Sequence, residues 1–337
     1  MVIAKKYVVV TPFVGEPKTS DFEIVEEQLP ALKDNEFLAE AAYISIDPYQ
    51  RMKLGNQYPC DMIGGQVAKV IESKNADYPV GSWVMGHFGW RTHTNVNPEN
   101  EKLCMQKPYL YKLPDFGNLP ISLALGLCGR VGNTAYFGFK EICQPKSGDT
   151  VVVSGAAGAV GSHVGQIAKI LGCRVIGFAG TDEKCDWLVK ELGFDCAANY
   201  KTTDIGKFLK ENAPTGVDCY FDNVGGEISS TVLSQMNQYG RVAICGAISS
   251  YNETDPEKRK ATMLQGFIVA KQLKLEGFLV NRFADRTMEG IVQNLQWVKE
   301  GNLKYKEHIT NGFESAADAF IGLFRGDNIG KTLVKVK

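Results

Sequence analysis

Residues 150–184 restrict the fold of this chain more than any other stretch of its sequence. The valines at 151–153 predict a buried strand, and a glycine-rich turn at 154–161 follows them directly. Apolar residues then recur at helical spacing over 160–171, and a second apolar run over 175–179 predicts another strand. A strand, a glycine turn, a helix and a strand in close succession form the unit in which a dinucleotide-binding turn is expected.

The turn has the form A-x-G-x-x-G, with Ala156, Gly158 and Gly161 at its defining positions. Gly158 lets a pyrophosphate approach the backbone without meeting a Cβ atom, and Gly161 lets the helix pack closely on the strand. Backbone N–H groups at the start of the helix then face the phosphate charge. The motif alone is weak, because glycine turns without a ligand are common. Its strand, turn and helix context favours nucleotide binding over a plain tight turn.

The end of the second strand bears on which dinucleotide binds. An NAD site usually places Asp or Glu there to hold the ribose 2′-hydroxyl. Here Gly180 leaves space and Lys184 brings a positive charge, which together suit the 2′-phosphate of NADP. The alternative makes Thr181 a helix N-cap and Lys184 a solvated residue, and the nearby Asp182 keeps NAD open. We predict NADP(H), because the space and the charge agree.

Composition excludes several classes of protein. A chain of 337 residues is long enough for two domains, and its net charge of −1 gives no general attraction to nucleic acid or to an anionic membrane. The nine cysteines include no C-x-x-C pair, which indicates reduced thiols and a cytoplasmic location. The N-terminus shows no leader-peptide pattern, and no apolar run reaches membrane-spanning length.

Other catalytic motifs are absent from the sequence. The four histidines stand apart from one another and from cysteine pairs, so we predict no metal site. The chain has neither a Gly-x-Ser-x-Gly elbow nor a Gly-x-x-x-x-Gly-Lys-Ser/Thr loop. A serine hydrolase and a phosphate-loop NTPase are therefore not supported.

The pattern of elements changes along the chain. Up to about residue 120, short β-like runs alternate with turn residues, which predicts a mostly antiparallel β domain. Beyond it, helices and strands alternate, which predicts a parallel sheet with helices on both faces. Ligands of such sheets bind beyond the carboxyl ends of the strands, where Asn223, Gly246 and Tyr251 are expected. We also expect helices over 228–236, 287–299 and 315–324 and a last strand over 331–336.

The chain contains eight short motifs that also occur, in the same order, in a known family. Several motifs in the right order are far more specific than one glycine turn. They lie at 46–51, 134–138, 156–162, 182–184, 199–201, 220–226, 245–249 and 326–332. On these motifs, the chain resembles the zinc-independent branch of the medium-chain dehydrogenase/reductase superfamily, in the group of prostaglandin and alkenal double-bond reductases.

The resemblance implies an α/β fold in which a Rossmann doubly wound parallel sheet is inserted in a GroES-like, mostly antiparallel β domain. The GroES-like substrate and catalytic domain is expected over 1–124 and 296–337, and the Rossmann NADP-binding domain over 125–295. It also implies a protein without zinc, which agrees with the absence of metal-ligand spacing.

The resemblance further implies a set of NADPH contacts. The pyrophosphate is expected on Gly158, Ala159, Val160 and Gly161, and the 2′-phosphate region on Lys184 and Tyr200. The other expected contacts are Asn223, Cys245, Gly246, Ala247, Ile248, Ser249, Tyr251, Phe278, Leu279, Val280 and Asn328. Without the resemblance, Tyr200 would be interpreted as an aromatic capping a strand end and Asn328 as a turn residue.

The family reduces carbon–carbon double bonds conjugated to a carbonyl, as in 15-oxoprostaglandins and 4-hydroxynonenal-type alkenals, with hydride delivered to the β-carbon. A neutral tyrosine hydroxyl can stabilise the resulting enolate and supply a proton. We predict Tyr251 as the enolate-stabilising donor and Tyr49 as the residue that positions the carbonyl, against the alternative of aromatic packing residues. Arg51 is expected beside the substrate site as a structural partner, and Arg130 either meets a substrate carboxylate or is solvated.

Three other functions compete with this one. They are an NADPH quinone reductase of the zeta-crystallin kind, a non-catalytic NADPH-binding protein, and a dehydrogenase that oxidises a hydroxy-eicosanoid such as leukotriene B4. The charged segment 252–260 also differs from the proline-rich segment that borders the family's substrate entrance. The family implies a homodimer, in which an edge strand over 273–280 would pair across a two-fold axis.

Overall fold

A computed structural model describes residues 2–52, 57–99, 110–255 and 264–337 of the chain. Part of the charged segment 252–260, residues 256–260, lies outside these ranges. The chain divides into two compact units. Unit 1 comprises residues 1–129 and 307–337, and unit 2 comprises residues 130–306.

Unit 1 is built on two mostly antiparallel sheets. The smaller sheet has the order β2 (Phe22–Gln28), β1 (Ile3–Val9) and β4 (Cys60–Asp61). The larger sheet has the order β15 (Glu307–Asn311), β16 (Lys331–Lys335), β3 (Phe37–Ser45), β5 (Gln66–Ser73), β6 (Trp83–Gly86) and β8 (Leu110–Lys112), with β7 (His93–Val96) paired to β3. Only β15 and β16 run parallel within it. The last strand of the chain, β16, thereby pairs with β3, which comes from the N-terminal part of the chain.

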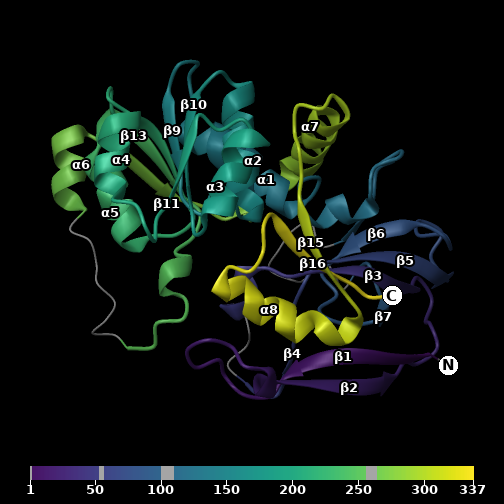
Figure 1. The fold of residues 1–337 in the computed structure, drawn as a ribbon. Coiled ribbons are helices and arrows are strands. Elements are labelled where there is room, and N and C mark those ends of the chain that lie inside the picture. The colour runs from purple at the N-terminus through teal and green to yellow at the C-terminus, as the bar shows by residue number, and fades with distance from the viewer. Residues whose placement is uncertain (1, 53–56, 100–109, 256–263) are drawn as a thin grey trace. The chain divides into compact units, whose positions relative to one another are not determined.

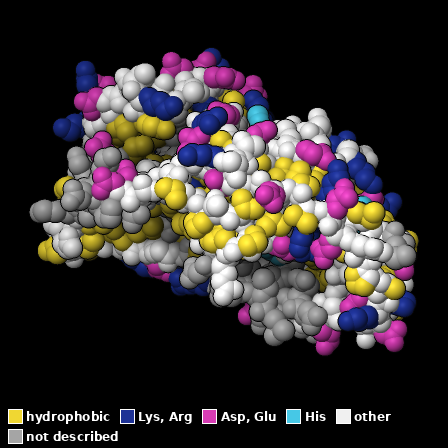
Figure 2. Space-filling view, turned by 90° about the horizontal axis from the view of Figure 1, so that it is seen from below, with side chains coloured by type: hydrophobic (Ala, Val, Ile, Leu, Met, Phe, Trp, Pro, Cys, Tyr) yellow, Lys and Arg dark blue, Asp and Glu magenta, His cyan; other side chains and the backbone are white. Residues whose placement is uncertain are grey.

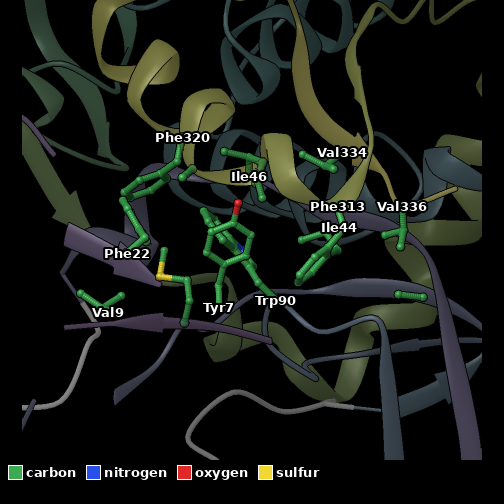
Figure 3. Close-up of a cluster of buried hydrophobic side chains, with 14 residues drawn as sticks. Tyr7, Val9, Phe22, Ile44, Ile46, Trp90, Phe313, Phe320, Val334 and Val336 are labelled. Carbon is green, nitrogen blue, oxygen red and sulfur yellow. The ribbon is translucent and has the colours of Figure 1, made fainter. Parts of the chain in front are cut away.

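An aromatic core anchors helix α8 (Ala316–Arg325) to the sheets of unit 1. Trp90 lies at its centre, with its ring 5.5 Å from Tyr7, 5.9 Å from Phe22 and 5.7 Å from Phe320 (Figure 3). The Tyr7 hydroxyl donates to the backbone oxygen of Glu314 over 2.6 Å. These contacts hold the N-terminal strands and the C-terminal helix together. Short helices of this unit are η1 (Thr19–Asp21), η2 (Pro48–Arg51), η4 (Ile121–Leu125) and η9 (Phe313–Ser315).

Unit 2 has one parallel sheet of six strands. Their spatial order is β11 (Cys196–Asn199), β10 (Arg174–Ala179), β9 (Thr150–Val153), β12 (Val217–Asp222), β13 (Met236–Ile244) and β14 (Lys274–Gly277). Numbered along the chain, this is the order 3-2-1-4-5-6 of dinucleotide-binding folds, with the direction of progress reversing between β9 and β12. The predicted α/β class with a doubly wound parallel sheet is confirmed.

Helices cover both faces of this sheet, with α1, α2 and α3 on one side and α4, α5 and α6 on the other (Figure 1). Hydrophobic residues pack between the helices and both faces of the strands. The helices of unit 2 are α1 (Arg130–Phe137), α2 (Ala159–Ile170), α3 (Asp182–Lys190), α4 (Ile205–Asn212), α5 (Gly226–Ser234), α6 (Gln265–Lys271) and α7 (Thr287–Lys299), with the short η5 (Gly138–Cys143), η6 (Ile248–Ser250) and η8 (Val280–Arg286).

Two expected elements differ in the structure. The helix predicted over 228–236 ends at Ser234, because Met236 is buried and pairs with Val217 as the start of β13. The edge strand predicted over 273–280 is only β14, and Val280 already begins η8. In both places tertiary pairing decides the element, and local periodicity does not.

The charges on one face of the molecule (Figure 2) agree with the balanced charge of the chain. On the face drawn in Figure 2, acidic and basic side chains are interspersed. Within the described ranges, no helix combines the length and the apolar character needed to cross a membrane.

Candidate functional site

The glycine turn follows β9 at the reversal point of the sheet in unit 2. Gly155 has a φ of +58°, which favours glycine, and Gly158 is the N-cap of α2. A Cβ atom on Gly161 would lie 2.4 Å from the Gly155 oxygen and 2.8 Å from the Ala156 Cα, so only glycine fits there. Among the described residues, a Cβ on Gly158 would meet the Gly155 oxygen at 3.2 Å and no other heavy atom beyond its chain neighbours within 4 Å. The turn therefore packs most closely at Gly161, and at Gly158 its close contact is with the Gly155 oxygen, where backbone N–H groups begin the helix.

The ends of β10 and β11 meet beside this turn. A Cβ on Gly180 would lie 3.3 Å from the Tyr200 hydroxyl and 3.6 Å from Cε of Lys201, so both side chains reach over Gly180. Asp182 is the acid that left NAD as an alternative cofactor on the sequence alone. Its carboxylate accepts a 2.9 Å hydrogen bond from the side-chain amide of Asn199. Tyr200 is 40% exposed, so its ring is accessible at this edge.

Helix α3 begins at this edge. Thr181 is its N-cap, and the Thr181 hydroxyl accepts from the backbone N–H of Lys184 over 3.3 Å. The Lys184 side chain thus starts from the first turn of α3, and it is partly buried. The predicted N-cap and the cationic residue occur together, so capping by Thr181 does not exclude a phosphate contact by Lys184.

A buried carboxylate organises the end of β12. Asp222 is 5% exposed, and its Oδ1 accepts from Tyr220, Ser154 and the backbone N–H groups of the following turn. The Ser154 hydroxyl in turn accepts from the backbone N–H of Asn223 over 3.0 Å. The side-chain amide of Asn223 donates to the backbone oxygen of Ser154 over 2.8 Å. Asn223 is therefore fixed between the ends of β9 and β12.

The loop after β13 is docked on the same turn. Cys245 donates its N–H to the Asp222 backbone oxygen over 2.8 Å, and Ile248 and Ser249 donate theirs to the oxygens of residues 223 and 224. Burial raises the pKa of the Cys245 thiol to about 12, so it is neutral. Backbone hydrogen bonds therefore join the predicted segment 245–249, which contains Ala247, to the turn that carries Asn223.

Tyr251 is folded back over this loop. Its hydroxyl accepts from the Ala247 N–H over 3.1 Å and would lie 3.0 Å from a Cβ on Gly246, so a side chain at 246 would displace it. Burial raises the pKa of the Tyr251 hydroxyl, while the Ala247 N–H lowers it. With its pKa raised, the phenol is neutral at physiological pH and keeps a proton to donate.

The segment after β14 continues from the loop. Phe278 donates its N–H to the Ile244 oxygen over 3.3 Å and turns its ring onto Gly138 and Phe221 in the core. Its side chain is therefore a packing group, and any contact of Phe278 with a ligand would be made by its backbone. Leu279 is 59% exposed, and Val280 begins η8.

Tyr49 and Arg51 lie on η2 in unit 1. The Tyr49 hydroxyl is 2.8 Å from Nε2 of His87, a hydrogen bond whose donor depends on the histidine tautomer. The Arg51 guanidinium lies 5.7 Å from the Phe13 ring centre and 5.9 Å from that of Phe324. Burial lowers the pKa of Arg51, and Asp21 opposes that shift. These contacts fit the predicted structural role of Arg51.

Two predicted residues lie in other parts of the units. The Asn328 side chain donates to the Gly330 oxygen over 2.8 Å, which shapes the turn before β16 in unit 1. Arg130 is the first residue of α1 in unit 2, where the Thr134 hydroxyl donates to its backbone oxygen. The roles of both toward a ligand stay predictions.

Comparison with known proteins identifies the family. Residues 5–103 match a family model described as the N-terminal domain of oxidoreductase, and residues 159–297 match one described as zinc-binding dehydrogenase. The chain is 50% identical to prostaglandin reductase 1 from Bos taurus, with 99% of this chain and 100% of the relative covered. The chain belongs to the medium-chain dehydrogenase/reductase superfamily.

Two further relatives of this medium-chain dehydrogenase/reductase agree with that assignment. It is 39% identical to the NADP(+)-dependent 2-alkenal reductase of Nicotiana tabacum, over 99% of this chain and 98% of the relative. The crystal structure of CurA from Vibrio vulnificus in complex with NADPH has a TM-score of 0.89 and 36% identity, over 99% of each chain. The predicted family resemblance is confirmed.

Zinc ligation has no visible basis in the described part of this medium-chain dehydrogenase/reductase. Within those ranges, no three His, Cys, Asp or Glu side chains are grouped so that they could hold a metal ion. His163 is buried in α2, and burial lowers the pKa of its imidazole to about 3, so it is a neutral interior residue.

Three residues with evident local roles were not predicted from the sequence. His87 contacts Tyr49, Asp222 organises the β12 turn, and Lys201 reaches over Gly180. Asp222 at the end of an apolar strand and Lys201 beside Tyr200 are local signals that could have been noticed. No local pattern links His87 to Tyr49, because they lie 38 residues apart.

Proposed function

We infer that this protein uses NADPH to reduce the carbon–carbon double bond of enones and enals. The observation that carries this inference is the full-length likeness to prostaglandin reductase 1 and to 2-alkenal reductase. The substrate class comprises carbonyl compounds with a conjugated double bond, such as 15-oxoprostaglandins and 4-hydroxynonenal-type alkenals. Oxidation of a hydroxy-eicosanoid such as leukotriene B4 remains a second reaction of the same site.

The proposed cofactor cradle is the edge of the unit 2 sheet. The pyrophosphate binds over Gly158 to Gly161, where the helix start and the lack of side chains favour a phosphate. Lys184 and Tyr200 hold the 2′-phosphate region, and Asn223 lies by the nicotinamide half. The proposed wall of the site is made by residues 245–251 and 278–280, and Asn328 is a further proposed cofactor-binding residue.

Bound NADPH supplies the hydride that is added to the β-carbon of the substrate. Negative charge then develops on the carbonyl oxygen, and a donor placed there lowers the barrier. Tyr251 fills this role in our proposal, because its neutral hydroxyl accepts from Ala247 and can donate its own proton. A proton must finally reach the α-carbon, and Tyr251 is the proposed source.

Tyr49 positions the substrate carbonyl in this proposal. Its hydrogen bond with His87 fixes the direction of the phenol. If His87 Nε2 carries a proton and donates it, the Tyr49 hydroxyl is left to donate to the carbonyl. Arg51 has a structural role in this proposal, and its guanidinium packs on the ring of Phe13. Arg130, the first residue of α1, is the proposed contact for a substrate carboxylate.

Lys184→Ala should raise the KM for NADPH about 10-fold and leave the KM for NADH nearly unchanged, because one charge-assisted hydrogen bond to a phosphate is worth about 1.5 kcal/mol. Steady-state kinetics with both cofactors measures the ratio. Lys190→Ala is the matched control, since Lys190 is an exposed residue at the other end of α3, paired with Asp186. An equal change with both cofactors would remove Lys184 from the 2′-phosphate site.

The reaction is tested by NADPH oxidation with 4-hydroxynonenal, a 15-oxoprostaglandin and a 1,4-quinone, with NADH in parallel. Turnover of the two enone substrates with NADPH is expected. Turnover of the quinone alone would instead indicate a quinone reductase. Binding of NADPH without any turnover would leave a binding protein.

We also propose the finer features of the assembly. Residues 1–124 with 296–337 are the proposed substrate and catalytic domain and 125–295 the proposed NADP-binding domain, bounds that differ from those of the two compact units, 1–129 with 307–337 and 130–306. The protein acts in the cytoplasm, in lipid metabolism. The cysteines that the structure describes are free thiols, which suits that reducing compartment.

The protein forms a homodimer through β14, which is an edge strand of the unit 2 sheet. Sedimentation at micromolar concentration should give a dimer, and a monomer would contradict this.

A further inference from the structure

Lys331 carries its charged group into the interior of unit 1. Its side chain is 3% exposed, on the last strand, β16. The Lys331 Nζ atom donates to the Ile46 oxygen over 2.7 Å, to Asp47 Oδ1 over 2.9 Å and to the Thr332 oxygen over 2.9 Å. These three acceptors match the three donors of an ammonium group. A buried charge is costly unless it is fully bonded in this way, so the arrangement has a defined geometry.

Two of the three acceptors lie directly before the turn that carries Tyr49. Residues 46 and 47 join β3 to η2, and Tyr49 is the second residue of η2. The other carboxylate oxygen of Asp47 accepts from the Ser45 hydroxyl, and the Asp47 N–H donates to Oε1 of Gln50 over 2.9 Å. Gln50 is fully buried, and its Nε2 donates back to the Ser45 oxygen over 2.9 Å. Lys331 is therefore bonded to a network of hydrogen-bonded polar groups at the base of the turn.

Asp47 is the carboxylate that matches the charge of Lys331. The other nearby acid is Glu307, which lies opposite Lys331 on β15. Glu307 accepts from the Ser122 hydroxyl over 2.8 Å, and its Oε1 is buried without a hydrogen-bond partner among the described residues. Burial raises the pKa of Glu307, although Ser122 and Lys331 oppose the shift. Burial likewise lowers the pKa of Lys331, and Asp47 opposes that shift most strongly.

We propose that Lys331 is a positioning residue for Tyr49. From the C-terminal strand it holds the turn of residues 47–51, and it thereby sets the position of the Tyr49 hydroxyl beside His87. The assignment of Tyr49 to the substrate carbonyl rests on the proposed function. The link between Lys331 and the Tyr49 turn rests on the contacts alone.

The first test is a double-mutant cycle with Lys331→Met and Tyr49→Phe. Methionine keeps the length of the side chain and removes its charge. Lys331→Met should lower kcat/KM for an enone about 30-fold, because a small misplacement of a positioned group has effects of this size. The Kd for NADPH should change less than two-fold, since Lys331 is not among the proposed cofactor contacts and its Nζ is bonded to residues 46, 47 and 332. Lys335→Met, at an exposed site on the same strand, is the matched control and should match the wild type.

The cycle separates positioning from general stability. In the Tyr49→Phe background, Lys331→Met should lower kcat/KM less than three-fold, because the hydroxyl that it positions is already gone. An equal loss in both backgrounds, or wild-type kinetics for Lys331→Met, would overturn the proposal. If Lys331→Met does not fold, Asp47→Asn replaces it in the same cycle, with a smaller expected loss of about five-fold.

A second readout does not depend on turnover. The chain has four histidines, so the His87 imidazole can be assigned in a ¹⁵N NMR spectrum by comparison with His87→Gln. Lys331→Met or Asp47→Asn should shift the His87 Nε2 resonance, and Lys335→Met should not. An unchanged resonance would overturn the link between Lys331 and Tyr49. Absence of enone turnover in the wild type would instead contradict the proposed function, while this measurement still tests the link.

Discussion

Tyr251→Phe should lower kcat for an enone about 100-fold, because removal of one donor to a developing oxyanion has an effect of this order. The substitution removes a single oxygen atom and keeps the ring. That oxygen lies over Gly246 and accepts from Ala247, so its loss also leaves one backbone N–H without its partner. We expect a local cost of about 1 kcal/mol in stability from that lost hydrogen bond.

The measurement is kcat with saturating NADPH and 4-hydroxynonenal, together with the Kd for NADPH from fluorescence titration. The Kd should change less than the rate, because the proposed role of Tyr251 belongs to the chemical step. Tyr239→Phe is the matched control, since Tyr239 is 62% exposed on β13 of the same unit. Full kcat/KM in Tyr251→Phe would show that this tyrosine is only a packing residue.

Gly161→Ala should weaken NADPH binding at least 100-fold and destabilise unit 2 by about 3 kcal/mol, the upper end of the usual cost of overpacking. The added methyl would lie 2.4 Å from the Gly155 oxygen and 2.8 Å from the Ala156 Cα. Both are backbone atoms of the glycine turn, so they cannot rotate away as a side chain could. Helix α2 must shift from β9, and its first N–H groups then lose their alignment toward the phosphate.

Thermal unfolding and NADPH titration of the variant test this expectation. Gly266→Ala is the matched control, because Gly266 lies in the first turn of α6, also in unit 2, and a Cβ atom there would meet no heavy atom of the described residues outside its own helix within 4 Å. It should be neutral or slightly stabilising, since alanine is favoured over glycine in a helix. Gly161→Ala with wild-type affinity for NADPH would mean that the turn can open without loss of the cofactor site.

Much of the fold was predictable from local patterns. The apolar run before the glycine turn became β9, and the periodic run after it became α2. The helix predicted over 287–299 has those bounds in the structure as α7. Such elements can be predicted because burial of one face imposes a period of its own on a helix or a strand. Where the sheet imposed another requirement, as at Met236, the local pattern was wrong.

The site was predictable only where its residues lie in motifs. The glycine turn, Asn223 and the 245–251 loop were expected at strand ends, and the parallel order of the strands places them on one edge of the sheet. Their hydrogen-bond partners were not predictable. Asp222 binds Ser154 across 68 residues, and no periodicity extends over such a distance.

By itself, the sequence determined the alternation of elements, the glycine turn and the family motifs, because these depend on neighbours within a few residues. Only the tertiary structure decided that His87 meets Tyr49 and that Lys331 reaches Asp47, 284 residues away in the chain. The physical reason is that β16 pairs with β3, and this pairing brings the buried ammonium group of Lys331 to the carboxylate of Asp47, which matches its charge.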